Sequence, residues 1–145
     1  MTTLYVLFKV ADAEYVLPAA DVLHMESYAG ATRVPGAPEY VAGLMQIRRR
    51  VIPVVDLRLR FGLPAVEPSL GSRVVVVQTG ERAVGLLADS AREVKQLSAD
   101  DFRPPPELIA QQSAGYVTKV AQAGARLLML IDLHKVIGEE VPLGR

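Results

Sequence analysis

Short segments of the chain alternate between apolar and polar side chains with a period of two. In residues 4–10, for example, Leu4, Val6 and Phe8 share one face. This period is typical of strands with one buried face, and turn residues separate the segments at short intervals. The pattern therefore predicts about ten strands and an all-β fold. The expected strands are residues 4–10, 14–17, 22–28, 43–48, 51–55, 73–78, 83–88, 92–97, 115–120 and 126–131.

The third expected strand, residues 22–28, carries apolar residues on both faces. Leu23 and Met25 fall on one face, and Val22 and His24 fall on the other. Because a half-buried strand turns only one face inward, we assign Leu23 and Met25 to the core. Val22 and His24 are then expected to face solvent.

One phrase occurs twice in the sequence. VIPVVDLRLRFG at residues 51–62 aligns without a gap with LLMLIDLHKVIG at residues 127–138. The alignment pairs Asp56 with Asp132, 76 positions later. Each Asp directly precedes a short helical pattern that a glycine ends, so both are expected to be structural helix caps.

This repetition predicts two copies of one unit within a single domain, residues 1–145. The approximate repeats are residues 4–62 and 73–138. Two five-stranded barrels packed side by side about a pseudo-twofold axis, with short helices, fit the number and spacing of the strands. The sequence leaves open whether the first strand pairs within its own barrel or is swapped into the other.

Composition narrows the possible functions. Lys plus Arg and Asp plus Glu each number 16, so the formal net charge is zero, which argues against a nucleic-acid-binding module. The chain has no Cys, and hence no disulfide or thiolate metal site. No apolar run reaches membrane-spanning length, and an expected strand from Leu4 leaves no room for a signal peptide, so we expect a cytoplasmic protein without membrane insertion.

The sequence contains no recognisable catalytic constellation. Neither His24 nor His134 has a metal-ligand spacing with another residue, and no phosphate-binding or dinucleotide-binding motif is present. Asp56 and Asp132 are more simply explained as caps than as paired catalytic carboxylates. We therefore expect no enzyme, no cofactor and no metal.

Binding is the better candidate activity. Arg48, placed in its strand on the same face as Gln46, can offer a planar five-donor guanidinium to a carboxylate or carbonyl of a partner. Arg103 and Glu107 flank a run of three prolines, which is either a rigid connector or a preorganised contact loop. The neighbouring Arg49 and Arg50 are expected to be solvated residues at the tip of a hairpin.

The central segment GLMQIRRRVIPVVDLRLRFG resembles the signature of CheW-type chemotaxis coupling proteins, G-[VI]-x-N-L-R-G-x-[IV]-[VI]-P-V-[VI]-D-L-R-x-[RK]-F-G. The likeness continues through RVVVV, VGLLADSAREV and FRPPPEL to YVTKVAQAGARLLMLIDLHKVI, and so covers residues 4–137. It implies two SH3-like barrels and a non-enzymatic adaptor. Such adaptors join the regulatory domain of a CheA-type histidine kinase to the cytoplasmic tip of methyl-accepting chemoreceptors, in arrays to which we expect this protein to be recruited.

The resemblance also implies which residues contact each partner. The expected receptor-binding residues are Val22, His24, Gln46, Arg48 and Val74. The expected kinase-binding residues are Arg103, Glu107 and Leu108.

Three positions depart from the family pattern near the expected receptor face. Gln46 replaces the usual Asn, Arg49 the usual Gly, and His24 the usual Glu. The Gly would ease a turn with positive φ, and a histidine introduces a side chain that gains a proton near neutrality. These departures suggest a divergent receptor or a parallel chemosensory-like pathway. One alternative is a CheW-like protein that has lost receptor or kinase binding and serves another partner. The other is an enzyme regulator or small-molecule sensor that uses the groove between the barrels.

Overall fold

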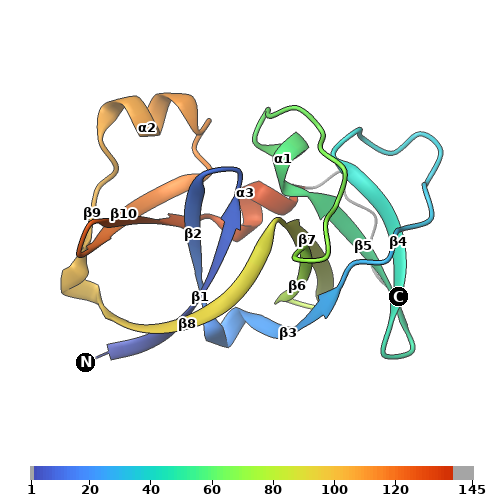
Figure 1. Ribbon diagram of the computed structural model, residues 1–145, viewed down its shortest axis with the longest axis horizontal. Helices are drawn as coiled ribbons and strands as arrows, with labels where there is room; N and C mark the ends of the chain where they lie inside the picture. The colour runs from blue at the N-terminus through green and yellow to red at the C-terminus, as the bar shows by residue number, and fades with distance from the viewer. Residues whose placement is uncertain (1, 139–145) are drawn as a thin grey trace.

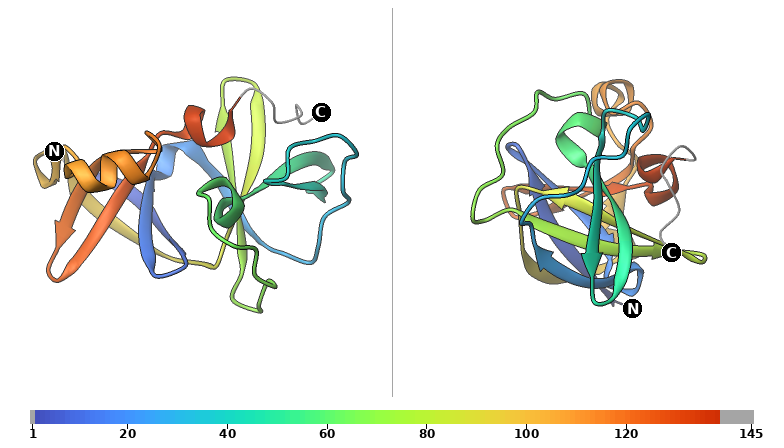
Figure 2. Two further views of the ribbon diagram at one scale, coloured as in Figure 1. Left: turned by 90° about the horizontal axis from the view of Figure 1, so that it is seen from above. Right: turned by 90° about the vertical axis from the view of Figure 1, so that its right-hand side faces the viewer.

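Two sheets, each curled into a barrel, lie side by side in the computed structural model, which describes residues 2–138 (Figures 1 and 2). Sheet A has the strand order β8-β1-β2-β11-β10-β9, and sheet B the order β3-β6-β7-β5-β4. The strands of sheet A are β1 (Thr2–Val10), β2 (Ala13–Pro18), β8 (Ser90–Ser98), β9 (Phe102–Arg103), β10 (Val117–Ala123) and β11 (Arg126–Ile131). Those of sheet B are β3 (Val22–Ser27), β4 (Val41–Ile47), β5 (Arg50–Asp56), β6 (Arg73–Thr79) and β7 (Arg82–Ala88).

The alternating pattern located the main strands correctly, and the all-β prediction is confirmed. The helical segments are all short: η1 (Ala19–Asp21), α1 (Leu57–Arg60), η2 (Ala99–Asp101), α2 (Glu107–Gln112) and α3 (Leu133–Ile137). The sequence did not predict α2 or the two-residue strand β9. α2 begins directly after Pro106, where the first helical positions need no backbone donor, so the proline run leads into a helix.

Both aspartates of the repeated phrase cap a short helix. The Asp56 carboxylate accepts hydrogen bonds from the backbone N–H groups of Arg58 and Leu59 at the start of α1. Asp132 accepts one from Lys135 in α3, so both predicted caps are confirmed. Burial raises the pKa of the Asp56 carboxyl, against the lowering effect of these backbone hydrogen bonds.

Each sheet takes strands from both halves of the chain. Sheet A joins β1 and β2 to strands that follow residue 89, and sheet B joins β3, β4 and β5 to β6 and β7. Four strand pairs join the halves: β2 with β11 and β5 with β7 are parallel, and β1 with β8 and β3 with β6 are antiparallel. Neither half of the sequence therefore makes a complete sheet alone.

Three clusters of buried side chains form the core. Leu7, Val16 and Leu128 belong to the cluster of sheet A, and Val54 and Val74 to a cluster of sheet B. The largest cluster combines residues of both sheets with α3. Strand β6 serves two of these clusters, because its alternate valines point to opposite faces: Val74 and Val76 to one, Val75 and Val77 to the other.

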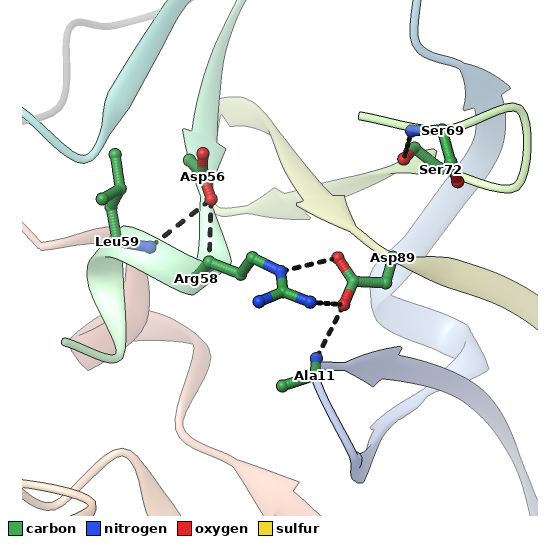
Figure 3. A network of polar contacts seen from close by, with 7 residues as sticks. All are labelled: Ala11, Asp56, Arg58, Leu59, Ser69, Ser72 and Asp89. Atoms are coloured by element: carbon green, nitrogen blue, oxygen red, sulfur yellow. Dashed lines mark hydrogen bonds and ion pairs between the residues drawn. The ribbon is translucent and has the colours of Figure 1, made fainter. Parts of the chain in front are cut away.

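A polar network links the two sheets beside α1 (Figure 3). Arg58 donates two hydrogen bonds to the Asp89 carboxylate, at 3.0 and 2.7 Å. The same carboxylate accepts the backbone N–H of Ala11, in the β1–β2 turn, at 2.7 Å. Asp89 raises the pKa of the Arg58 guanidinium by hydrogen bonding and charge. The network holds the β1–β2 hairpin of sheet A against the first helix of sheet B.

Arg60 makes a second link, between α1 and α3. Its Nε donates to the backbone carbonyl of Val136 at 2.7 Å, and its Nη2 to that of Lys135 at 2.9 Å. The guanidinium also lies over the rings of Tyr40 and Tyr116, 4.1 and 5.2 Å from their centroids. The two tyrosines are 76 positions apart, the spacing of the sequence repeat, so Arg60 lies between equivalent residues of the two halves.

The structure corrects the predicted orientation of β3. Leu23 and Met25 are exposed, at 44% and 37%, so their assignment to the core is wrong. Val22 is half-buried and packs against the cluster shared by the sheets, and His24 and Glu26 are half-buried on the same side. β3 is an edge strand of sheet B with a bulge between Val22 and His24, and alternation alone does not tell which face of such a strand turns inward.

Candidate partner-binding surfaces

The β4–β5 hairpin presents three consecutive arginines. Its two turn residues, Arg48 and Arg49, both have positive φ, 50° and 71°, and the flanking Ile47 and Arg50 pair across the ladder. A two-residue turn of this kind matches the right-handed twist of the strands but suits Asn and Gly better than Arg. Arg48 thus lies in the turn, and its predicted position within the strand is wrong. The positive φ expected at Arg49 is confirmed.

Arg48 reaches from this turn to β3. Its side chain is 67% exposed, and its Nε donates a hydrogen bond of 3.1 Å to Oε1 of Glu26. His24 Nδ1 lies 3.4 Å from the same oxygen. The five residues Val22, His24, Glu26, Gln46 and Arg48 are called the β3 surface below. Gln46, on β4, is exposed.

Val74 does not contribute side-chain surface to this region. It pairs with Glu26 across the β3–β6 ladder, but its side chain points into sheet B and is fully buried. The structure therefore gives Val74 a packing role, and it gives a partner no access to the side chain.

The three expected kinase-binding residues lie at the end of β9 and the start of α2. Arg103 ends β9 and is exposed. Glu107 begins α2, where its carboxylate accepts a hydrogen bond from Gln111 at 3.2 Å, and an acidic residue in the first turn favours the helix. Leu108 is 64% exposed. Arg103, Glu107 and Leu108 are called the α2 surface below.

The two surfaces belong to different sheets. α2 stands over sheet A, beside β10, whereas β3 and the β4–β5 turn belong to sheet B (Figure 1). No residue of α2 is buried, so the helix shows most of its side chains to solvent. The arrangement leaves room for two partners to bind at once.

A groove of about 520 Å³ separates α2 from α1. Aromatic and aliphatic side chains line most of it, among them Tyr15, Phe61, Tyr116 and Met129. Burial raises the pKa of Tyr15. Arg60 is the charged residue of the lining, and its guanidinium already bonds to α3. The groove can hold an apolar group, but its lining contains no cluster of acid, base and nucleophile.

The sequence pattern missed several residues that organise these surfaces. Glu26 lies two positions after His24 in β3, and the sequence does not show that the β4–β5 turn folds back onto this strand to meet it. Arg58 and Asp89 are 31 positions apart, and no spacing rule joins them. The only sequence feature that marks Arg60 is its position within the repeated phrase, residues 51–62.

Within residues 2–138, no group of three or more His, Cys, Asp or Glu side chains is placed to hold a metal ion. None of the helices described there is long and apolar enough to cross a membrane.

Comparison with known proteins agrees with the sequence signature. The CheW-like domain model matches residues 4–141. The chemotaxis protein CheW of Rhizobium meliloti is 30% identical over 93% of this chain and 87% of its own length. That of Klebsiella aerogenes is 29% identical over 94% of this chain and 82% of its own. The crystal structure of the scaffolding protein TtCheW from Thermoanaerobacter tengcongensis superposes with a TM-score of 0.89, at 29% identity, and covers 99% of both chains.

The match therefore spans both repeats, both sheets and both candidate surfaces. Sequence signature, strand order and superposition agree on a single architecture, and the chain belongs to the family of CheW-like domains.

Proposed function

We propose that this protein is a non-enzymatic adaptor that couples chemoreceptors to a CheA-type histidine kinase in the cytoplasm, at receptor arrays. One observation supports the proposal: apart from the buried Val74, the residues that match the partner contacts of the family are at least partly exposed and fall into two separate groups on different sheets. An adaptor needs two such surfaces, because each partner must bind without displacing the other. The proposal assigns the receptor to the β3 surface and the kinase to the α2 surface.

The chemistry of the two surfaces differs in a way that fits this assignment. Arg48 is a largely exposed cation that can bind a carboxylate or a helix-terminal carbonyl of a receptor. The α2 surface combines an exposed apolar anchor, Leu108, with Arg103 and Glu107 of opposite charge. A central apolar contact within a polar rim is typical of small, transient interfaces.

The first test measures kinase binding. Titration calorimetry of the purified protein against the regulatory domain of the CheA-type kinase from the same genome is expected to show binding. Glu107→Arg is expected to weaken it by about tenfold or more, the loss typical of an interface anchor. Glu67→Arg is the matched control, because Glu67 is an exposed acid in the loop before β6 and lies outside both surfaces. Absence of binding by the unmodified protein would favour a CheW-like protein that serves another partner.

The second test measures receptor binding. Arg48→Glu is expected to weaken binding of a soluble receptor tip fragment with only a small fall in Tm, because the side chain is exposed and its ion pair with Glu26 contributes little. Arg49→Glu makes the same change of charge in the same turn and is expected to bind nearly normally. Equal losses of affinity for the receptor fragment in both variants would show that the total charge of the turn, rather than the position of Arg48, determines binding. A fall in Tm as large as that of a core truncation would contradict the exposed position of Arg48.

A further inference from the structure

Two side chains compete for one carboxylate oxygen at the edge of sheet B. Glu26 Oε1 accepts a hydrogen bond from Arg48 Nε at 3.1 Å, and His24 Nδ1 lies 3.4 Å from it. The Nδ1 atom of His24 is buried, and it has no hydrogen-bond partner among the described residues. A ring nitrogen of His24 therefore lies near a carboxylate oxygen that already accepts a hydrogen bond from Arg48.

The surroundings give His24 and Arg48 the same acidic partner. In the described part of the chain, each of them forms an ion pair with Glu26 and with no other acid. Strand β6 places Val76 opposite His24, and its one ionisable residue, Arg73, pairs with Ser27 instead. The turn of the β4–β5 hairpin and its flank add two further cations, Arg49 and Arg50, and no acid that could neutralise a protonated His24.

The protonation state of His24 decides how the carboxylate is shared. When the His24 imidazole is neutral, Arg48 remains the charged partner of the Glu26 carboxylate. A protonated imidazole donates from both ring nitrogens and places a second positive charge beside the same oxygen. The His24 side chain is only 20% exposed and is held by its strand, whereas Arg48 is 67% exposed. Arg48 loses this competition, because holding a long exposed side chain costs rotamer entropy and its ion pair is screened by water.

We propose that Glu26 competes with the partner for Arg48 and that His24 makes this competition depend on pH: protonated His24 takes the Glu26 carboxylate and frees the Arg48 guanidinium for an acidic or carbonyl group of the partner. The proposal rests on the receptor-binding role proposed for Arg48. Histidines gain a proton between about pH 8 and 5, so binding strengthens as the pH falls through this range.

The first experiment uses the free protein and needs no partner. NMR of ¹⁵N-labelled protein follows the Arg48 Nε–H signal between pH 7.5 and 5.5. In the unmodified protein, the signal is expected to move toward its position in Glu26→Gln, in which the carboxylate charge is absent. In His24→Gln it is expected to stay at the Glu26-bound position at both pH values. An immobile signal in the unmodified protein, or the same movement in His24→Gln, would overturn the proposal.

The second experiment adds a soluble receptor tip fragment and measures its Kd at both pH values. The unmodified protein is expected to bind about two- to fivefold more tightly at pH 5.5, the range set by the strength of an exposed ion pair. His24→Gln should lose this dependence, and Glu26→Gln should bind tightly at both pH values. If the Arg48 signal moves with pH but the fragment binds at neither value, the competition for Glu26 is supported and the receptor role of Arg48 is overturned. Binding that does not change with pH while the signal moves overturns the proposed effect on the partner.

Discussion

At the scale of single residues, the β4–β5 turn places two arginines in a backbone conformation that favours glycine. Arg48 and Arg49 both occupy the left-handed region, at φ of 50° and 71°. A residue with a Cβ pays a conformational penalty there that glycine avoids. Arg48 has a structural partner in Glu26, whereas the described contacts give Arg49 no ion pair or side-chain hydrogen bond. Within residues 2–138, no ion pair or side-chain hydrogen bond of Arg49 offsets this strain.

Replacing Arg49 by Gly is expected to stabilise the protein by about 0.5–1 kcal/mol, because glycine adopts this conformation without strain. Urea denaturation at neutral pH measures the free energy of unfolding. Arg49→Ala is the matched control: it removes the same charge and side chain but keeps a Cβ, so it should bring no comparable gain. Equal stabilisation by Ala and Gly would mean that charge repulsion within the arginine run, rather than backbone strain, is the dominant cost.

At the scale of elements, the two capped helices join strands to the contacts between barrels. The Asp56 side chain fixes the start of α1, from which Arg58 and Arg60 reach Asp89 and α3. The carboxylate is half-buried and carries a raised pKa because burial penalises its charge. A raised pKa in the folded state means that folding favours the protonated acid. This contribution to stability is complete below the pKa of the unfolded chain and is lost as the pH rises through the folded value.

Asp56→Asn keeps an oxygen that accepts the backbone N–H groups but carries no charge. We expect this variant to gain stability relative to the unmodified protein as the pH rises from about 4, near the unfolded Asp pKa, to 7. Urea denaturation of both proteins across this range measures the difference. Asp56→Ala removes the cap and should cost about 1 kcal/mol relative to Asp56→Asn throughout. The opposite result is that Asp56→Asn loses stability relative to the unmodified protein as the pH rises. It would show that the backbone hydrogen bonds affect the pKa of Asp56 more than burial does.

At the scale of the whole molecule, the exchange of strands makes the two barrels one folding unit. Sheet A lacks most of its strands without the second half of the chain, and sheet B lacks β6 and β7. The loop between α1 and β6 carries no strand pairing, and Leu70 within it is fully exposed. A break within the exposed middle of this loop is therefore expected to leave the packing of the two halves intact.

A protease site inserted after Val66 is expected to allow cleavage without dissociation, because every sheet holds strands from both fragments. The cleaved protein should elute from a sizing column as one species, and at high protein concentration its Tm should stay near that of the intact chain. Fragments 1–66 and 67–145, purified separately, should lack a cooperative melting transition by circular dichroism and regain it on mixing. A fragment that melts cooperatively alone would contradict the interdependence of the halves.

The sequence by itself determined the local structure and the family. A period of two defined the strands, and Asp56 and Asp132 marked the helix starts, because strand pleating and capping depend on residues close together in the chain. The repeated phrase predicted the two-barrel architecture, since equal patterns fold into equal units. The signature also indicated Arg48, Arg103, Glu107 and Leu108, all of which are exposed.

Only the tertiary structure decided which faces turn inward and which distant residues meet. Leu23 and Met25 carry the pattern of a buried face, yet β3 lies at the edge of its sheet with that face open to solvent. Glu26 becomes the partner of Arg48 only because the β4–β5 turn folds back onto β3. The physical reason is the same in both cases: burial and ion pairing depend on contacts between segments far apart in the chain, which local periodicity does not encode.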